Sequence, residues 1–351
     1  LRKLHDTDAQ SAHHISESSF HWQGQLVHVQ GKDTVPVDGS GFSISRQRML
    51  DILAKRAIDL GVQIQFETEI ARTSQLPESD LIVACDGVNS RLRRLDAEPF
   101  KTNVHVGRNK YIWLGTSRVF NPFTYAFVET DAGWIWFYGY AFNSEASTCV
   151  VECSPETWAG LGFDRRGTEE SISLLERTFE PYLDGRPLMV QKRDPGSMPW
   201  LNFQTVANRR WHNDDIVLMG DAAHTTHFSI GSGTRLAIED AIALAGQLQE
   251  HERLQAALEA YGAERRAALV SPARRARDSA RWFENIPRHI DLEAQQFGTL
   301  LALRDRFSRP VAHLPPRVYY RLYEGARRFE VLRRLRRWVR SKPRLNRLRG
   351  G

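Results

Sequence analysis

The residues best suited to chemistry lie in one turn of the segment VLMGDAAHTTHFSIGSGTRLAIEDAIALA (217–245). Gly220 and Asp221 end an apolar run, and Gly231 and Gly233 lead into a helical pattern. Glycines let the backbone approach a ligand closely, and free N–H groups at a helix N-terminus stabilise anionic oxygens. An aspartate at the carboxyl end of a strand accepts hydrogen bonds from sugar-like hydroxyls. The turn predicts a site for a phosphate or an electron-rich ring system, with turn capping as the structural alternative for Asp221.

Two other segments carry polar residues in a suggestive order. The segment DLIVACDGVNSRLR (80–93) is a buried-strand pattern that stops at an acidic residue and a glycine. Asp86 could be a simple helix N-cap, which is the alternative to a ligand contact. The helical pattern ISRQRMLDIL places Arg46 at its start. Each segment alone is weak evidence for a binding site.

Together the three segments resemble the FAD-dependent aromatic hydroxylases related to p-hydroxybenzoate hydroxylase. GDAAH followed by GSG and AIEDA is similar to that family's second flavin motif, and Asp86, Gly87, Ser90 and Arg93 match its Asp-Gly-x-x-Ser-x-x-Arg fingerprint. Arg46 matches the Arg of Arg-x-x-Leu-x-x-x-Leu, with Met49 in place of the first Leu. GRNKYIWLGT, GWIWFYGYAF and SARWFE further resemble the subgroup that acts on salicylyl-CoA, anthraniloyl-CoA and violacein precursors.

The resemblance implies a flavin site and a reaction. FAD is reduced by NADH or NADPH, and oxygen from O2 is transferred to an activated aromatic ring, an aryl-CoA thioester or an indole or tryptophan derivative. The implied cofactor-binding residues are Arg46, Asp86, Gly87, Ser90, Arg93, Gly220, Asp221, Ala222, Gly231, Ser232 and Gly233. His224 and His227 are the candidates for a catalytic role, and structural histidines are the alternative. No metal site is expected.

Aromatic side chains follow one another along the predicted strands and could line a pocket for a flat substrate. These are Trp113, Tyr125, Phe127, Trp134, Trp136 and Tyr138, together with Phe228 of the glycine-rich turn. The alternative for strand aromatics is core packing. Phe228 stands where the wider family has a proline, and Arg235 replaces a common Asn. Arg108 and Lys110 could meet an acidic substrate or CoA phosphates, but a solvated loop explains them better.

The elements that must position these residues predict an α/β fold. We expect a partial, Rossmann-like FAD-binding domain with some substrate-side strands in 1–103 and an antiparallel-sheet substrate domain in 104–205. The FAD-binding domain is completed in 206–310 with C-terminal helices, and 311–351 forms a basic helical tail. Among the elements expected are a helix in ISRQRMLDILAKRAIDLG (44–61), closed by Gly61, and a strand over 62–70.

Composition bounds the class of protein. The 351 residues are 41% hydrophobic, as in ordinary globular proteins, and no apolar run is long enough to cross a membrane or act as a signal peptide. We therefore expect a cytoplasmic protein, with a homodimer left open. Cys149 and Cys153 favour core packing. The net charge of +6 concentrates after Pro316, which favours a solvated tail over contact with a membrane surface, nucleic acid or an acidic partner.

Alternatives of other classes remain at this stage. The dinucleotide-binding motif Gly-x-Gly-x-x-Gly is expected before Leu1 and does not open the chain, which suggests a truncated sequence. A flavoprotein oxidase or reductase of the same fold is the first alternative. An inactive remnant acting as a binding module is the second.

Overall fold

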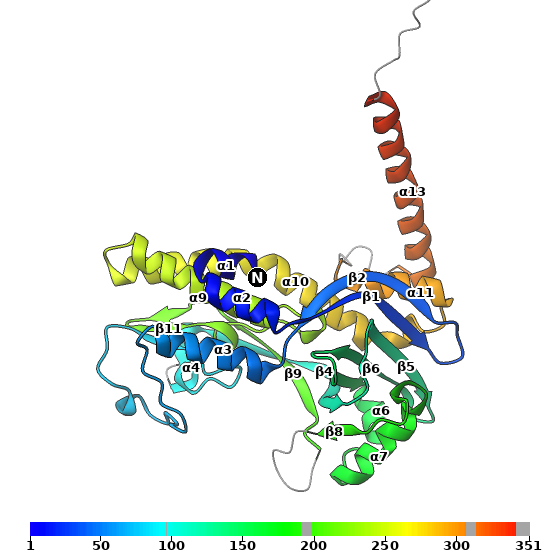
Figure 1. The fold of residues 1–351 in the computed structure, drawn as a ribbon, viewed down its shortest axis with the longest axis horizontal. Coiled ribbons are helices and arrows are strands. Elements are labelled where there is room, and N and C mark those ends of the chain that lie inside the picture. The colour runs from blue at the N-terminus through cyan, green and yellow to red at the C-terminus, as the bar shows by residue number, and fades with distance from the viewer. Residues whose placement is uncertain (96, 191–197, 307–313, 342–351) are drawn as a thin grey trace, which may run out of the picture.

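A computed structural model describes residues 1–95, 97–190, 198–306 and 314–341. It consists of a large sheet flanked by helices and a smaller sheet that packs beside it (Figure 1). The strands are β1 (Phe20–Val29), β2 (Val35–Ser43), β3 (Ile82–Ala84), β4 (Thr102–Thr116), β5 (Phe123–Thr130), β6 (Gly133–Ala141), β7 (Ser147–Cys153), β8 (Leu188–Val190), β9 (Leu201–Asn208), β10 (His212–Asn213) and β11 (Ile216–Leu218).

Helices connect and cover the two sheets. The shorter ones are α1 (Arg2–Thr7), α2 (Ala9–Glu17), α4 (Arg91–Leu95), α5 (Ala97–Phe100), α6 (Pro155–Gly160), α8 (Glu180–Leu183) and α11 (Ala294–Ala302). The longer ones are α3 (Arg46–Asp59), α7 (Thr168–Thr178), α9 (Gly233–Glu250), α10 (Leu254–Glu284) and α13 (Pro316–Ser341). Five 3-10 turns, η1 (Thr73–Gln75), η2 (Gly220–Ala222), η3 (Phe228–Ile230), η4 (Ile286–Arg288) and η5 (Arg304–Arg306), complete the described part.

The large sheet runs in the order β2-β1-β5-β6-β7-β4-β8, and β9 also pairs with β4. Its pairs are antiparallel except β1 with β5. Because side chains alternate between the two faces of a strand, Ile135 and Phe137 of β6 face one core and Trp136 and Tyr138 face another. The first core packs under α7 and α8, and the second packs under the end of α10 and α11. Both faces of this sheet are therefore buried.

The small sheet positions the two polar turns found in the sequence. Its order is β10-β11-β3, and β11 runs parallel to β3 in the register Val217 with Val83. Parallel strands end at the same edge, so the turns after Ala84 and Leu218 lie side by side. A third apolar cluster, which includes Trp211, Leu236 and Tyr261, packs α9 and α10 against this sheet.

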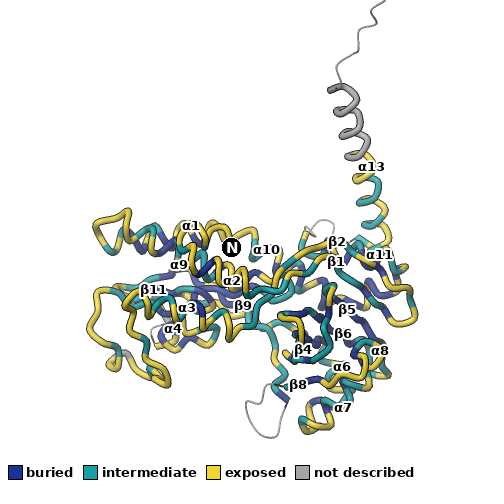
Figure 2. Tube along the Cα trace, in the orientation of Figure 1, coloured by how far each residue is buried: buried dark blue, intermediate teal, exposed yellow. Residues whose placement is uncertain are grey.

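Most of the predicted elements are confirmed, and one strand prediction is wrong. Residues 62–70 form no strand, and Val62 and Phe66 are 53% and 72% exposed (Figure 2). The alternating pattern finds no neighbouring strand to supply backbone hydrogen bonds, so it stays irregular. The helix before it ends as predicted, with Gly61 at φ +88°. Cys149 and Cys153 are buried in the core as free thiols.

The basic C-terminal segment is helical as far as Ser341, and the rest of the expected tail, together with 311–313, lies outside the described residues. Tyr319, Tyr320 and Tyr323 at the start of α13 pack against the core of the large sheet, while the helix continues away from the body (Figure 1). Within the described ranges, no helix has the length and apolar character needed to span a bilayer.

Candidate functional site

The turn after β11 leaves one carboxylate at the surface. Gly220 adopts φ +59°, which an L side chain rarely reaches, and η2 starts there. Asp221 is exposed at the carboxyl end of the strand. Removal of water by the surrounding protein raises the pKa of Asp221, while the charges of His224 and Arg46 oppose that rise. The two residues that the sequence motifs singled out, Arg46 and Asp221, are thus close enough to interact.

A second carboxylate, the aspartate of AIEDA, to which the sequence analysis gave no role of its own, fixes the same turn from behind. Asp240 of α9 is fully buried and accepts hydrogen bonds from the Gly220 amide at 3.1 Å and from His224 Nε2 at 2.8 Å. Its other oxygen accepts from Arg265 Nε of α10 at 2.7 Å. Trp211 stacks on the His224 ring with centroids 5.1 Å apart. His224 therefore supports the turn, which is the structural alternative left open by the sequence.

The Asp-Gly-x-x-Ser-x-x-Arg fingerprint is mostly a structural frame. Asp86 accepts the amide hydrogens of Arg91 at 2.6 Å and Leu92 at 3.3 Å, so it caps α4. Ser90 is fully buried and its Oγ accepts from the Arg93 amide at 3.0 Å. Arg93 is also buried, and its guanidinium donates to the carbonyl oxygens of Ala222 at 2.7 Å and Val88 at 2.6 Å. Arg93 therefore joins the two polar turns to each other.

The glycine segment before α9 faces open space. Gly231 adopts φ +59°, and a side chain built on Gly87, Gly231 or Gly233 would meet no atom within 4 Å. Ser232 is buried, its Oγ pairs with Thr226 Oγ at 3.0 Å, and it makes no side-chain cap on α9. The first turn of α9 contains no acidic residue. Its amides and its dipole are therefore available to an anionic group.

The loop between the turn and these glycines is hydrogen-bonded to β9. The Thr225 amide donates to the Val206 carbonyl at 3.1 Å, and Thr225 Oγ1 donates to the Gln204 carbonyl at 2.6 Å. Asn208 Nδ2 donates to the Ala223 carbonyl at 2.6 Å. Since β9 belongs to the large sheet, these bonds bring the loop of the small sheet onto the large one.

An aromatic shelf forms where the loop reaches the large sheet. Phe228 contacts Tyr111 at 4.7 Å and Trp113 at 5.8 Å between ring centroids, and His227 stacks on Phe228 at 4.3 Å. Phe203 of β9 closes the group at 4.9 Å from His227. Trp113 is 47% exposed, so the shelf has an open aromatic surface. We call these five residues the aromatic shelf. It contains Trp113 and Phe228 of the predicted pocket residues, whereas Tyr111 and Phe203 were not predicted from the sequence.

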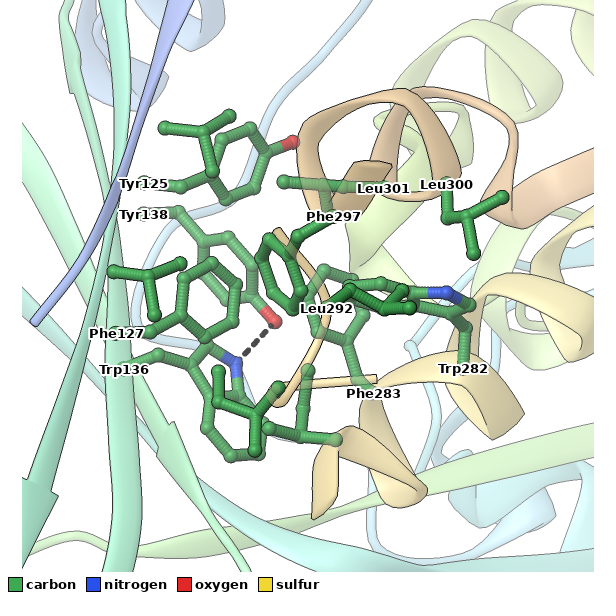
Figure 3. Packing of buried hydrophobic residues seen from close by; sticks show 14 of the residues in the cluster. Tyr125, Phe127, Trp136, Tyr138, Trp282, Phe283, Leu292, Phe297, Leu300 and Leu301 are labelled. Carbon is green, nitrogen blue, oxygen red and sulfur yellow. Dashed lines mark hydrogen bonds between the residues drawn. The ribbon is translucent and has the colours of Figure 1, made fainter. Parts of the chain in front are cut away.

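The other predicted pocket aromatics lie in the core, the alternative that the sequence left open. Figure 3 shows Tyr125, Phe127, Trp136 and Tyr138 packed against Trp282, Phe283 and Phe297. Phe127 is 0% and Trp136 2% exposed, so protein surrounds both rings. Trp134 packs half-buried against the same cluster. Tyr138 of this group reaches the shelf, with its ring centroid 6.0 Å from that of Phe228.

A buried acid that was not predicted from the sequence lies next to Tyr138. Glu152 of β7 is 1% exposed; it accepts a short hydrogen bond from the Tyr138 hydroxyl and one from Asn109 Nδ2 at 2.7 Å. Burial without a cationic partner raises the pKa of Glu152 to about 7. A charged residue directly after the apolar run Cys149–Val151 was the available signal.

The cations proposed for an acidic substrate are engaged locally. Arg108 pairs with Glu156 at 2.7 Å on the surface. Lys110 lies over the Trp158 ring at 4.7 Å. Arg108 is exposed, as in the solvated interpretation, but the prediction of a loop was wrong because both residues lie in strand β4, which pairs with β7 and β9.

These residues fit the flavin that the family resemblance implies. Asp221 offers an exposed acceptor for hydroxyls, Arg46 and the uncapped start of α9 offer positive charge for phosphate oxygens, and three glycines leave room for close approach. Among the described residues, no group of His, Cys, Asp and Glu side chains could hold a metal ion.

Comparisons with known proteins agree with this geometry. A family model described as FAD binding domain matches residues 42–276. Salicyloyl-CoA 5-hydroxylase of a Streptomyces species is 36% identical over 286 residues, 79% of this chain and 54% of that protein. Protodeoxyviolaceinate monooxygenase of Chromobacterium violaceum is 33% identical over 257 residues, 72% of this chain and 67% of that protein. The chain thus spans about half the length of the Streptomyces protein.

A third relative and two solved structures extend the match. The 3-hydroxy-4-methyl-anthranilyl-[aryl-carrier protein] 5-monooxygenase of Streptosporangium sibiricum is 33% identical over 283 residues, 80% of this chain and 74% of that protein. A tetrameric 2-methyl-3-hydroxypyridine-5-carboxylic acid oxygenase superposes with a TM-score of 0.63 at 18% identity, covering 84% and 82% of the two chains. A probable FAD-dependent monooxygenase of Pseudomonas aeruginosa gives 0.60 at 17% identity and covers 87% of each chain. These structures share the fold.

Proposed function

Because this chain belongs to the family of FAD binding domains, we propose that it is a flavin-dependent monooxygenase that hydroxylates an aromatic ring with NAD(P)H and O2. The observation that carries the proposal is the exposed carboxylate of Asp221, which the charge of Arg46 reaches, in a segment that leads to the uncapped, glycine-lined start of α9. This arrangement suits a ligand that combines hydroxyls with phosphates.

We assign the cofactor contacts as follows. Asp221 accepts hydrogen bonds from the ribityl hydroxyls, and Arg46 with the α9 amides offsets phosphate charge. Ser90, Arg93, His224 and Asp240 hold the turns in shape from behind. When bound and reduced by NADH or NADPH, FAD supplies the activation of O2 for transfer to the ring.

The aromatic shelf is the proposed place for the substrate. Trp113 and Phe228 offer flat apolar surface beside the loop, which favours stacking of an aromatic ring and excludes water from it. The similar proteins are named for salicyloyl-CoA, protodeoxyviolaceinate and an anthranilyl group on an aryl-carrier protein. We therefore propose an aryl thioester or an indole or tryptophan derivative as substrate class.

The activity is tested by following NAD(P)H oxidation with the protein expressed from its complete gene. Aryl-CoA thioesters and indoles should stimulate oxidation, and a product should carry heavy oxygen when the reaction runs under labelled O2. Hydrogen peroxide formed in the same amount as NAD(P)H is consumed, without labelled product, would indicate an oxidase or reductase. A colourless protein that gains no flavin would indicate an inactive binding module.

Two broader predictions concern the whole protein. We propose a cytoplasmic location, which cell fractionation would test. A homodimer is the proposed assembly, and light scattering of the purified protein would distinguish it from a monomer.

A further inference from the structure

A line of side chains connects the 3-10 turn η5 to His227 of the aromatic shelf. Arg304 Nε of η5 donates to Ser279 Oγ of α10 at 3.1 Å, and Ser279 Oγ pairs with Ser229 Oγ of η3 at 2.7 Å. Ser229 Oγ in turn lies 2.8 Å from His227 Nδ1. Neither α10 beyond residue 276 nor η5 lies within the part matched by the family model.

Both ends of this line fix the direction of its hydrogen bonds. A guanidinium can only donate, so the Ser279 hydroxyl accepts from Arg304 and keeps its own hydrogen for donation to Ser229. Ser229 then donates to His227 Nδ1. The Ser229 backbone amide, which also can only donate, approaches the same nitrogen at 3.4 Å. Because this amide makes His227 Nδ1 an acceptor, the Ser229 hydroxyl donates to Nδ1 and accepts from Ser279, and the ring proton is left on Nε2.

Arg304 is held firmly enough to impose this order. Its Nη2 donates to the Ser229 carbonyl at 2.8 Å and to the Tyr125 hydroxyl at 3.2 Å, and Nη1 donates to the Leu301 carbonyl at 2.8 Å. The guanidinium also lies 5.5 Å from the centre of the Phe283 ring. With these contacts, rotation away from Ser279 would break several bonds at once.

We infer that Arg304, through Ser279 and Ser229, is a positioning residue that fixes His227 as a neutral Nε2–H donor for an electron-rich oxygen of the aromatic ligand. Nε2 lies across the ring from Nδ1, so it points away from Ser229. Burial, and then the charge of Arg304, lower the pKa of His227 to about 3, which keeps the ring uncharged. The ligand part of the inference rests on the proposed function, and the tautomer part does not.

The tautomer is tested by nuclear magnetic resonance of protein labelled with nitrogen-15 in histidine. The His227 signals are assigned from their loss in His227→Gln. We expect a proton on Nε2 only in the unchanged protein and in Ser229→Thr, which keeps the hydroxyl. Ser229→Ala and Ser279→Ala should show a share of the Nδ1–H form. A proton on Nδ1 in the unchanged protein, or no response to either alanine, overturns the inference.

The ligand part is tested on the same variants with FAD bound. Ser279→Ala should raise the KM for the aromatic substrate by about three- to tenfold, the worth of one neutral hydrogen bond, while the Kd for FAD stays unchanged. Ser171→Ala is the matched control, because Ser171 is a fully buried helix serine whose hydroxyl has no partner in the described part. An unchanged KM in Ser279→Ala overturns the donor role. A failure of all proteins to bind FAD overturns the proposed function instead and leaves the tautomer result standing.

Discussion

At the scale of single residues, the two carboxylates of the glycine-rich segment, Asp240 and Asp221, differ in how many protein groups bind them. Asp240 is buried and is bonded by an amide, an imidazole and a guanidinium. Asp221 lies 19 positions earlier at the surface, where Arg46 and His224 act on it through charge. A carboxylate whose bonds are filled by protein organises structure, and one left toward solvent can bind a ligand. The sequence could suggest Asp221 but could not reveal the partners that distinguish it from Asp240.

Glu152 makes stability depend on pH. Its pKa is raised from 4.5 to about 7, so the stability that the protonated form contributes is fully present below pH 4.5 and is lost as pH rises to about 7. Relative to Glu152→Gln, the unchanged protein should lose up to about 3 kcal/mol of unfolding free energy across that window. Urea unfolding at a series of pH values measures this. The exposed Glu145→Gln is the control, and a difference between the unchanged protein and Glu152→Gln that does not vary with pH would contradict the assignment.

At the scale of elements, the ion pair between α9 and α10 should carry much of the local stability. Arg265 is 2% exposed and Asp240 0%, so neither charge has water to replace its partner. Asp240→Asn should lower the unfolding free energy by about 3 kcal/mol, because the buried Arg265 would keep only its longer 3.5 Å ion pair with Glu239. Denaturant unfolding is the measurement. Glu250→Gln, at the exposed end of the same helix, should change it by less than about 0.5 kcal/mol.

Substitutions at the two glycines of α9 should affect different properties, FAD binding at one position and helix stability at the other. A methyl group added at either position would meet open space, but Gly233 starts the helix at the proposed site and Gly246 lies far along it. Gly246→Ala should stabilise the protein by about 1 kcal/mol and leave the Kd for FAD unchanged. Gly233→Ala should weaken FAD binding on the order of tenfold, because its methyl group would enter the ligand's space. Equal affinities for the two variants, measured by flavin fluorescence, would contradict the placement.

Strand prediction succeeded where the predicted strand has a neighbouring strand to pair with, and failed where it has none. The runs that became β3 and β11 pair with each other, whereas 62–70 alternates equally well and stays irregular. The same limit applies to the site. The motif residues Asp86 and Arg93 were found by spacing, but only the fold shows that one caps α4 and the other joins two turns.

At the scale of the whole molecule, the site depends on contact between two sheets. The loop from the small sheet is bonded to β9, which places Phe228 against Tyr111 and Trp113 of the large sheet. The sequence predicted aromatic strands but not which face meets the loop. Phe127 and Trp136 lie in strands with the same kind of aromatic pattern as the strand of Trp113. They are nevertheless buried beneath α10 and α11, because those helices cover that part of the sheet (Figure 3).

The basic C-terminal helix should contribute to stability only through its first turns. Tyr319, Tyr320 and Tyr323 pack against the core, while the side chains of Ala326 to Phe329 are exposed. Ending the chain after Gly325 should leave the thermal midpoint nearly unchanged. Ending it after Leu314 should cost roughly 2 kcal/mol or more, because the tyrosine surface is lost. Comparable losses in both truncations would show that the later residues also support the fold.

The central claim, that the turn following β11 holds the flavin, is tested most directly by FAD affinity in a pair of matched variants. Asp221→Ala and Asp215→Ala remove one exposed carboxylate from opposite ends of the same strand. In titrations followed by flavin fluorescence quenching, Asp221→Ala should raise the Kd by about 10- to 100-fold, and Asp215→Ala should match the unchanged protein. Equal FAD binding by Asp221→Ala and the unchanged protein, or no binding by the protein from its complete gene, would contradict the account.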